Sequence, residues 1–452
     1  MPDILPILLT LAPVLPKTSC RQLHRIVLAI LAMSGRITQL GLSRWTDTGG
    51  SYRTIQRFFH TQIDWASVQW RFFERFVFRP DTVYLLAGDE SIVSKSGKHT
   101  HGMGWFFSSI LNTAIPGLAF FSIAIIDVTS RRAYPLSTQQ VIRSEEEKEQ
   151  TRKRKQKRKC KAPKRPPGRP KGSKNKQKAD LPLSPELQRS LLQGQAVMNL
   201  IRDKLSVTYF VLDGHFGNAF ATAMVRQMGL HILSKMAHNA QLYQPPTPEQ
   251  KAQHPRLKYG TRIDYQHLPA TLLVARTTEA GYCTEVYQAS CLHKHFADLI
   301  NVVIIVRTHL ESGRAGHVVL FSSDLRLDAV TLIDYYALRF QIEFTFRDAK
   351  QYFGLEDFMG VKAVSIQNAV GLSFFLVNLS RYLLEALRLS YPGAGVHDLK
   401  AFYRARHYIA AVLKCIPEKA GLISYSDLIE QVCRPGLIHP KQNGQTELEF
   451  AA

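Results

Sequence analysis

Asp89, Asp213 and Glu343 are the side chains whose types and positions could support metal-dependent phosphodiester chemistry. Asp89 follows the apolar run Val83–Gly88 and Asp213 follows Tyr209–Leu212, so each stands at the polar end of a predicted core strand. Cleaving a phosphodiester without a covalent intermediate requires carboxylate oxygens that hold Mg²⁺, which activates water and stabilises the leaving oxygen. If the two strands are neighbours, both carboxylates reach one site.

Two other acids compete with Asp89 for the first position. Glu90 is next in the chain, where strand alternation would point its side chain away from that of Asp89. Asp127 begins the turn Asp127–Arg131 between two predicted strands. An Asp that follows a strand is more often a turn former than a metal ligand, so the strands alone leave these alternatives open.

The third carboxylate lies in a helix predicted from about Asp328 to Tyr352. At about 100° per residue, four polar side chains of this helix fall within about 60° of one another: Tyr336, Arg339, Glu343 and Lys350. Two other acids, Asp334 and Asp348, fall on the opposite side, at about 160° and 120°. A surface ion pair on an amphipathic helix would give the same pattern. The geometry selects Glu343 as the acid presented with the basic pair.

The spacing Tyr336-(2)-Arg339-(3)-Glu343-(6)-Lys350 resembles the Y-(2)-R-(3)-E-(6)-K signature of bacterial DDE transposases of the insertion-sequence-four superfamily. Its surroundings, from Arg339 to Phe346, are similar to the family's R-W-x-I-E-x-x-F run, with Phe340 in place of the usual Trp. The resemblance covers roughly residues 80–390, including a β-rich insertion between the second Asp and the Glu.

This resemblance implies an RNase H-like catalytic fold and a set of roles. Asp89, Asp213 and Glu343 would bind two Mg²⁺ or Mn²⁺ ions. Arg339 and Lys350 would contact phosphate, and Tyr336 would position DNA or the helix. The family commonly nicks the DNA by hydrolysis, and the freed 3′ hydroxyl then attacks DNA by in-line transesterification, sometimes through a hairpin end. The second Asp lacks the longer polar extension of some relatives, so His215 is expected to be structural.

Apolar periodicity predicts the elements that must position these side chains. Strands are expected first, followed by a helix, strand, helix and strand typical of a βαβ unit, which together give a mixed sheet. The expected ranges are Val83–Ala87, Leu118–Val128, Arg132–Leu136, Pro185–Leu205, Tyr209–Leu212, Ala219–Met228 and His231–Ser234.

Residues 20–80 have helical apolar spacing interrupted at Gly49 and Gly50. Ser51 can cap the helix that follows, which presents Arg53 and Arg57 on one face. This pattern fits a helix-turn-helix-like DNA reader and an ordinary basic surface helix equally well.

Residues 151–178 contain 15 Lys or Arg and no acid, and they have too few apolar side chains to form a core. We expect a disordered basic arm. The stretch Arg165–Gly172 resembles an AT-hook, but Pro167 replaces the usual Arg and leaves Arg169, followed by Lys171, at the core. Nonspecific phosphate binding is therefore favoured over A·T reading or a linker without a role.

The net charge of +22 over 452 residues predicts a polyanionic partner, and nucleic acid is the leading candidate. Six cysteines without C-x-x-C spacing argue against a disulfide framework or a zinc ribbon and favour a reducing compartment. The apolar N-terminus lacks a basic start and is broken by prolines, and no apolar run is long enough to span a membrane. A soluble, cytoplasmic, nucleoid-associated protein is expected.

Taken together, the sequence predicts an α/β protein: an RNase H-like catalytic core, in which helices flank a mixed sheet, with a β-rich insertion and an N-terminal helical DNA-binding domain. The predicted function is metal-dependent cleavage at element ends and strand transfer, performed by a homodimer on terminal inverted repeats and target DNA. A non-catalytic DNA-binding or architectural protein and a general nuclease are the alternatives. The predicted segments are the N-terminal DNA-binding domain (1–80), the first part of the core (81–143), the disordered basic arm (144–180), the second part of the core (181–239), the β-rich insertion (240–325), the catalytic helix and end of the core (326–392), and a C-terminal helical region (393–452).

Overall fold

The computed structural model describes residues 2–46, 50–108, 111–159 and 182–415. The chain forms two compact units: unit 1 comprises Met1–Pro80, Ile92–Leu118 and Thr345–Ala452, and unit 2 comprises Asp81–Ser91 and Ala119–Phe344. The chain passes from one unit to the other four times: between Pro80 and Asp81, and within β1 (Tyr84–Ser94), β3 (Thr113–Asp127) and α11 (Gln341–Tyr352).

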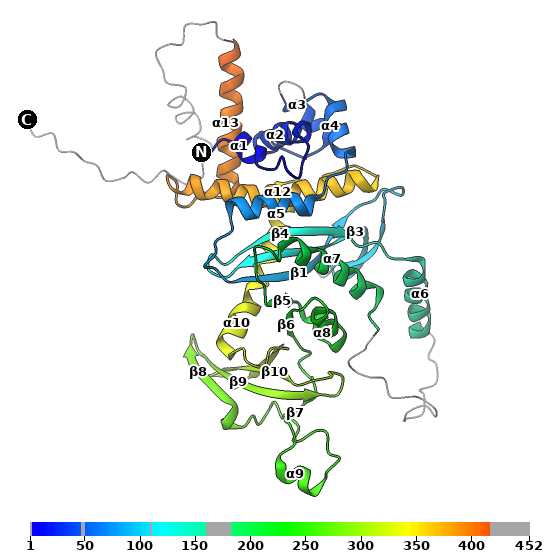
Figure 1. The fold of residues 1–452 in the computed structure, drawn as a ribbon, viewed down its shortest axis with the longest axis vertical. Coiled ribbons are helices and arrows are strands. Elements are labelled where there is room, and N and C mark those ends of the chain that lie inside the picture. The colour runs from blue at the N-terminus through cyan, green and yellow to red at the C-terminus, as the bar shows by residue number, and fades with distance from the viewer. Residues whose placement is uncertain (1, 47–49, 109–110, 160–181, 416–452) are drawn as a thin grey trace, which may run out of the picture. The chain divides into compact units, whose positions relative to one another are not determined.

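Unit 2 is organised around a mixed β-sheet with the strand order β4-β3-β1-β5-β6-β11-β10-β9 (Figure 1). Strands β1, β5 and β6 run parallel, whereas β3 with β4 and the series β6, β11, β10 and β9 pair antiparallel. The central strands are apolar and buried, as expected for a sheet covered by helices. The further strands are β4 (Arg132–Gln140), β5 (Tyr209–Leu212), β6 (His231–Lys235), β9 (Tyr282–His293), β10 (Ile300–His309) and β11 (Ala315–Ser322).

Three helices of unit 2 pack on this sheet: α7 (Pro185–Ile201), α8 (Ala219–Arg226) and α10 (Ala329–Leu338). Ser184 caps α7 by accepting a hydrogen bond from Leu187 N. The buried Gln193 amide donates to the carbonyl oxygens of Phe121 and Ser137, which attaches α7 to β3 and β4. In Figure 1, α8 and α10 lie on opposite sides of β6. The predicted α/β class, with helices flanking a mixed sheet, is confirmed.

The predicted β-rich insertion is also present in unit 2. Its long antiparallel strands β9, β10 and β11 continue the sheet beyond β6. The smaller elements around them are β7 (Leu242–Tyr243), α9 (Pro248–Gln253), the 3₁₀ helix η2 (Ala270–Leu272) and β8 (Leu273–Glu279).

Unit 1 is mainly helical, and the long helix α12 (Ala363–Arg388) forms its core. The buried Asn368 amide donates to the carbonyl oxygens of Phe58, Phe59 and Thr61 and accepts from the Trp65 indole, so it joins α12 to α4 and α5. Helix α12 is long and apolar enough to span a membrane, but 83% of its most apolar window is buried, as in a core helix. The other elements are α1 (Ile4–Leu9), α2 (Lys17–Ala32), α3 (Gln39–Arg44), α4 (Tyr52–His60), α5 (Trp65–Phe76), β2 (Gly104–Ser108) and α13 (Val396–Cys415).

The single helix predicted from Asp328 to Tyr352 is wrong in one respect, because a turn at Arg339 and Phe340 divides it into α10 and α11. Around this turn the backbone hydrogen bonds span three residues, as in Glu343 N to Phe340 O. This tighter winding changes the angle between side chains on either side, so a wheel of about 100° per residue does not hold across it.

The basic arm differs from its prediction at its start, where Glu145–Lys159 forms helix α6. Ser144 and Glu147 cap each other reciprocally, and Glu147 also accepts two hydrogen bonds from Arg189. Caps and ion pairs between successive turns stabilise a helix that has no apolar face. Residues 160–181, including Arg169 and Lys171, lie outside the described residues.

Candidate active site

Asp89 and Asp213 occupy equivalent positions on neighbouring parallel strands. Strands β1 and β5 pair in parallel, with Gly88 opposite Leu212. Asp89 directly follows Gly88 and Asp213 directly follows Leu212, so both residues lie at the same edge of the parallel strands. Gly88 permits this close packing, because a Cβ there would come within 2.9 Å of Leu212 and Phe121. The structure thus brings these two predicted carboxylates together.

The backbone around Asp213 is held in place by local hydrogen bonds. Its Oδ1 accepts from His215 N at 3.1 Å, which caps the 3₁₀ helix η1 (Gly214–Phe216). Its carbonyl oxygen accepts from Ser234 Oγ at 2.7 Å. Since Ser234 lies on β6, the neighbouring strand fixes the point at which β5 ends.

Arg339 links two of the three predicted carboxylates. Its Nη1 donates to Asp89 Oδ2 at 3.2 Å and its Nη2 donates to Glu343 Oε1 at 2.7 Å. The Arg339 side chain is only 16% exposed, against 21% for Asp89 and 38% for Glu343. Partly buried ion pairs such as these are screened much less than surface pairs. The Arg339 guanidinium therefore belongs to this site together with the two carboxylates that it contacts.

Burial and charge determine the protonation of the site. Burial is the largest influence on Asp89 and raises its pKa to about 6; Arg339 opposes this shift, and the carboxylates of Asp213 and Glu343 add to it. Burial also opposes the charge on Arg339, but the contacts with Glu343 and Asp89 outweigh it and raise the pKa of the guanidinium. The three carboxylates and the guanidinium thus form one electrostatic group.

Tyr336 belongs to the same group. Burial raises the pKa of its hydroxyl, and the nearby charges of Arg339, Asp213 and Glu343 modify it further. Tyr336 lies on α10, one turn before Arg339. The structure therefore places Tyr336 beside the carboxylates and Arg339.

The donor set suits a hard divalent cation, because carboxylate oxygens are the ligands that Mg²⁺ and Mn²⁺ prefer. Across residues 2–46, 50–108, 111–159 and 182–415, however, no three His, Cys, Asp or Glu side chains form a group that could hold a metal ion as they stand. Two of the carboxylates instead point their oxygens at Arg339. The residues therefore fit a metal in chemistry, and Asp89 and Glu343 would have to turn from Arg339 to bind it.

Of the two competing acids, Asp127 lies away from this group. Val128 N donates to Val83 O, which places Asp127 beside the start of β1, several residues before Asp89. Asp127 is buried and accepts from Ser130 N, as a turn former does.

Glu90 lies in a different electrostatic environment from Asp89. Burial raises its pKa, and the charges of Glu186 and Arg143 act on it more strongly than those of Asp89 and His215. Glu186 and His215 form a hydrogen bond at 3.1 Å, which raises the pKa of His215. The sequence analysis missed this pair, because a contact between residues so far apart in the chain leaves no local pattern.

Of the other predicted DNA-contacting residues, Lys350, Arg53 and Arg57 lie in unit 1. Lys350 donates to Ile92 O at 2.7 Å and pairs with Glu356 at 3.3 Å. Arg53 and Arg57 are exposed on α4, as the sequence predicts.

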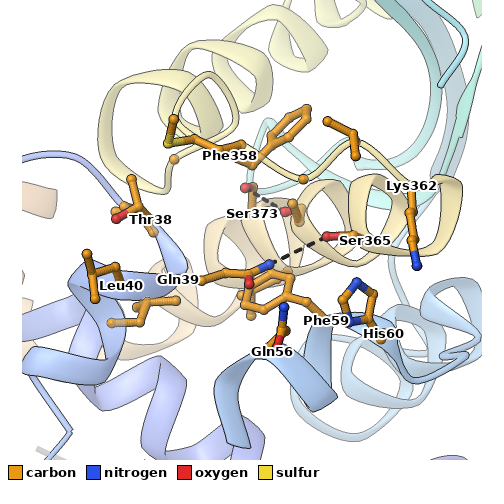
Figure 2. Close-up of a pocket in the computed structure, with 18 of the residues that line it drawn as sticks. Thr38, Gln39, Leu40, Gln56, Phe59, His60, Phe358, Lys362, Ser365 and Ser373 are labelled. Atoms are coloured by element: carbon orange, nitrogen blue, oxygen red, sulfur yellow. Dashed lines mark hydrogen bonds between the residues drawn. The ribbon is translucent and has the colours of Figure 1, made fainter. Parts of the chain in front are cut away.

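Helix α4 also borders a cavity of about 460 Å³ in unit 1. Figure 2 shows Gln56, Phe59 and His60 of α4 facing this cavity, opposite Ser365 of α12. Gln39 closes one side by donating to Ser365 Oγ at 3.5 Å.

Comparison with known protein families identifies the class of this chain. Residues 10–288 match the family described as DDE superfamily endonuclease, and the chain belongs to that family. The mixed sheet with flanking helices is accordingly an RNase H-like DDE nuclease core. The matched residues include Asp89 and Asp213 and end before Glu343. No curated protein matches the chain.

Proposed function

We propose that this protein is a DNA transposase of the insertion-sequence-four superfamily, which cleaves DNA at the ends of its element and joins those ends to target DNA. The observation that carries the proposal is the group formed by Asp89, Asp213, Glu343 and Arg339 at one edge of the RNase H-like sheet. Membership of the DDE endonuclease family accounts for a nuclease. The spacing of Tyr336, Arg339, Glu343 and Lys350 supports the narrower assignment to this transposase superfamily.

Asp89, Asp213 and Glu343 would hold two Mg²⁺ or Mn²⁺ ions. When bound, the metal would activate the attacking hydroxyl and stabilise the leaving oxygen of the phosphodiester. Arg339 would then be released from Asp89 and Glu343, and its forked donors would suit the phosphate being cleaved. Tyr336, one helical turn before Arg339, would position the DNA strand.

The remaining predicted partners belong to the same proposal. The N-terminal helices, with Arg53 and Arg57, would read the terminal inverted repeats, and Lys350, Arg169 and Lys171 would contact phosphates. A homodimer would hold two element ends at once. The division of the chain into the segments predicted from the sequence, from the N-terminal domain (1–80) to the C-terminal helical region (393–452), is proposed with these roles.

The test uses a labelled duplex carrying the inverted repeat that flanks the gene, incubated with Mg²⁺. Wild-type protein should nick it at the element end and leave a 3′ hydroxyl. Asp213→Asn and Glu343→Gln should bind it with unchanged affinity but cleave it at least about a thousandfold more slowly, equivalent to roughly 4 kcal/mol of transition-state stabilisation.

Asp334→Asn is the matched control. Asp334 is a carboxylate of the same helix as Tyr336, but it pairs with Arg131 at 2.7 Å and is 40% exposed. This variant should retain cleavage. Wild-type binding without nicking or joining would favour the non-catalytic DNA-binding alternative, and equal cleavage of unrelated DNA would favour a general nuclease.

A further inference from the structure

The β-rich insertion contains a groove that the proposed active site does not use. It lies at the ends of β9, β10 and β11 and has a volume of about 680 Å³. Its lining includes two arginines and two histidines, and none of its lining residues is acidic. The side chains that matter here are Tyr282, Arg307, His309 and Arg314.

Small residues keep the floor of the groove open. Arg307 of β10 is paired with Gly316 of β11, and Thr308 with Ala315. A Cβ at Gly316 would meet no atom within 4 Å. The backbone of β11 is therefore accessible beside the Arg307 side chain, and a polymer backbone could approach it closely.

The positive charge of the groove has an aromatic support. The Arg307 guanidinium carbon lies 4.1 Å from the centre of the Tyr282 ring, a cation–π contact. The Tyr282 ring in turn packs edge-on against His309, with their centres 4.8 Å apart. This stack limits the conformations of Arg307, so less entropy is lost when a ligand binds the guanidinium.

His309 is oriented as a hydrogen-bond donor. The backbone N–H of Ser312 donates to His309 Nδ1 at 3.2 Å, and Ser312 Oγ lies 3.1 Å from the same atom. An Nδ1 that accepts a hydrogen bond carries no proton in the neutral ring, so Nε2 carries it. The neutral imidazole therefore presents an N–H that suits an anionic oxygen.

The neighbouring part of the insertion differs in charge. Arg276 of β8 forms an ion pair with Glu285 of β9, which neutralises both. Glu285 is paired with Val306, the residue before Arg307, so its side chain points to the other face of the sheet. The positive charge of the groove face is thus separate from this neutralised pair.

We propose that this groove binds the phosphodiester backbone of double-stranded DNA, with Arg307 and Arg314 each contacting a phosphate and His309 donating a further hydrogen bond. The chemistry is that of a phosphate-positioning surface, which sets where DNA lies without reading its sequence. The identification of the polyanion as DNA rests on the proposed function.

Salt-dependent binding tests this groove. The affinity of the full-length protein for a labelled duplex is measured by fluorescence anisotropy over a series of salt concentrations. Each phosphate contact contributes about 0.9 to the slope of log affinity against log salt. The double variant Arg307→Ala/Arg314→Ala should make this slope less steep by about two. It should weaken binding to specific and unrelated duplexes alike.

Lys251→Ala/Arg256→Ala is the matched control, because it removes the same charge from exposed positions at and just after α9 in the same insertion. Its slope should not change. Both double variants should retain the wild-type unfolding temperature, since the four side chains are exposed. An unchanged slope in the groove variant, or an equal loss in both variants, would overturn the proposal.

The result is separable from that of the proposed function, because anisotropy measures binding and not cleavage. If wild-type protein binds DNA but never cleaves it, the proposed function fails while the slope still decides the role of the groove. If wild-type protein cleaves element ends and the groove variant has the wild-type slope, the groove proposal alone fails.

Discussion

At the scale of single residues, the partners of Arg339 define the state of the site. Its guanidinium donates to Asp89 and Glu343, the two carboxylates that would share a metal with Asp213. A metal ion and this guanidinium compete for the negative charge of the same two carboxylates. The proposed site therefore couples metal binding to release of Arg339, and a DNA phosphate is the group best suited to take that guanidinium.

Arg339→Gln should therefore bind Mn²⁺ more tightly than wild type in the absence of DNA, because the carboxylates lose their competing cation. An increase of about tenfold corresponds to roughly 1.4 kcal/mol. Free Mn²⁺ is measured by electron paramagnetic resonance during a titration. Arg131→Gln, which releases only the exposed Asp334, should show the wild-type affinity. Equal Mn²⁺ affinity in wild type and Arg339→Gln would contradict this competition.

The raised pKa of Asp89, about 6, predicts a pH effect on stability. The folded protein binds more protons than the unfolded chain, whose Asp titrates near about 3.9. The stability contributed by the protonated carboxyl is therefore lost as pH rises from about 4 through 6. With a chelator present, the wild-type unfolding temperature should fall between about pH 4 and 6 by a few degrees relative to Asp89→Asn. Parallel curves for the two proteins would contradict the shift.

At the scale of elements, the parallel pairing of β1 and β5 places the first two carboxylates together. Gly88 is required for this pairing, because a Cβ at this position would lie 2.9 Å from two buried side chains. Gly88→Ala should lower the free energy of unfolding by about 1–3 kcal/mol, as overpacking does in other cores. Urea denaturation measures this change.

Gly316→Ala is the control for Gly88→Ala, since its Cβ would enter open space. It should leave the free energy of unfolding within about 0.5 kcal/mol of wild type. A Gly88→Ala variant as stable as Gly316→Ala would show that β1 and β5 do not pack as closely as the structure has them.

The sequence predicted those elements whose apolar pattern is strong and local. Strand β5 has the predicted bounds, Tyr209–Leu212, because a short buried run ends sharply at Asp213. Strand β1 extends to Ser94, well past the predicted end at Ala87, since its later residues are partly polar and pair without a continuous apolar pattern. Contacts between distant segments, such as Arg339 with Asp89, follow from the fold and have no local signal in the sequence.

Two departures from the predicted elements have local causes. The turn at Arg339 and Phe340 lies within a stretch whose apolar spacing is helical throughout, and the stretch contains no Gly or Pro that would predict a break. Helix α6 has no apolar face, so the apolar pattern could not reveal it, but the capping pair of Ser144 and Glu147 is visible in the sequence. Capping residues were the informative signal there, and composition was misleading.

At the scale of the whole molecule, the charge of +22 agrees with a DNA-acting protein of the DDE endonuclease family. The basic residues fall in separate segments: Arg53 and Arg57 in α4, the 15 Lys and Arg of residues 151–178, and Arg307 with Arg314 in the insertion. Each would contribute phosphate contacts independently.

The most direct test of the three-carboxylate site is a change of metal preference. Asp213→Cys and Glu343→Cys replace a hard oxygen ligand by a thiolate, which binds Mg²⁺ poorly and softer metals better. Cleavage of the element-end duplex by both variants should be lost in Mg²⁺ and partly restored in Mn²⁺, while Asp334→Cys should behave as wild type in either metal. Wild-type cleavage by Asp213→Cys or Glu343→Cys in Mg²⁺ would contradict the assignment of these carboxylates as metal ligands.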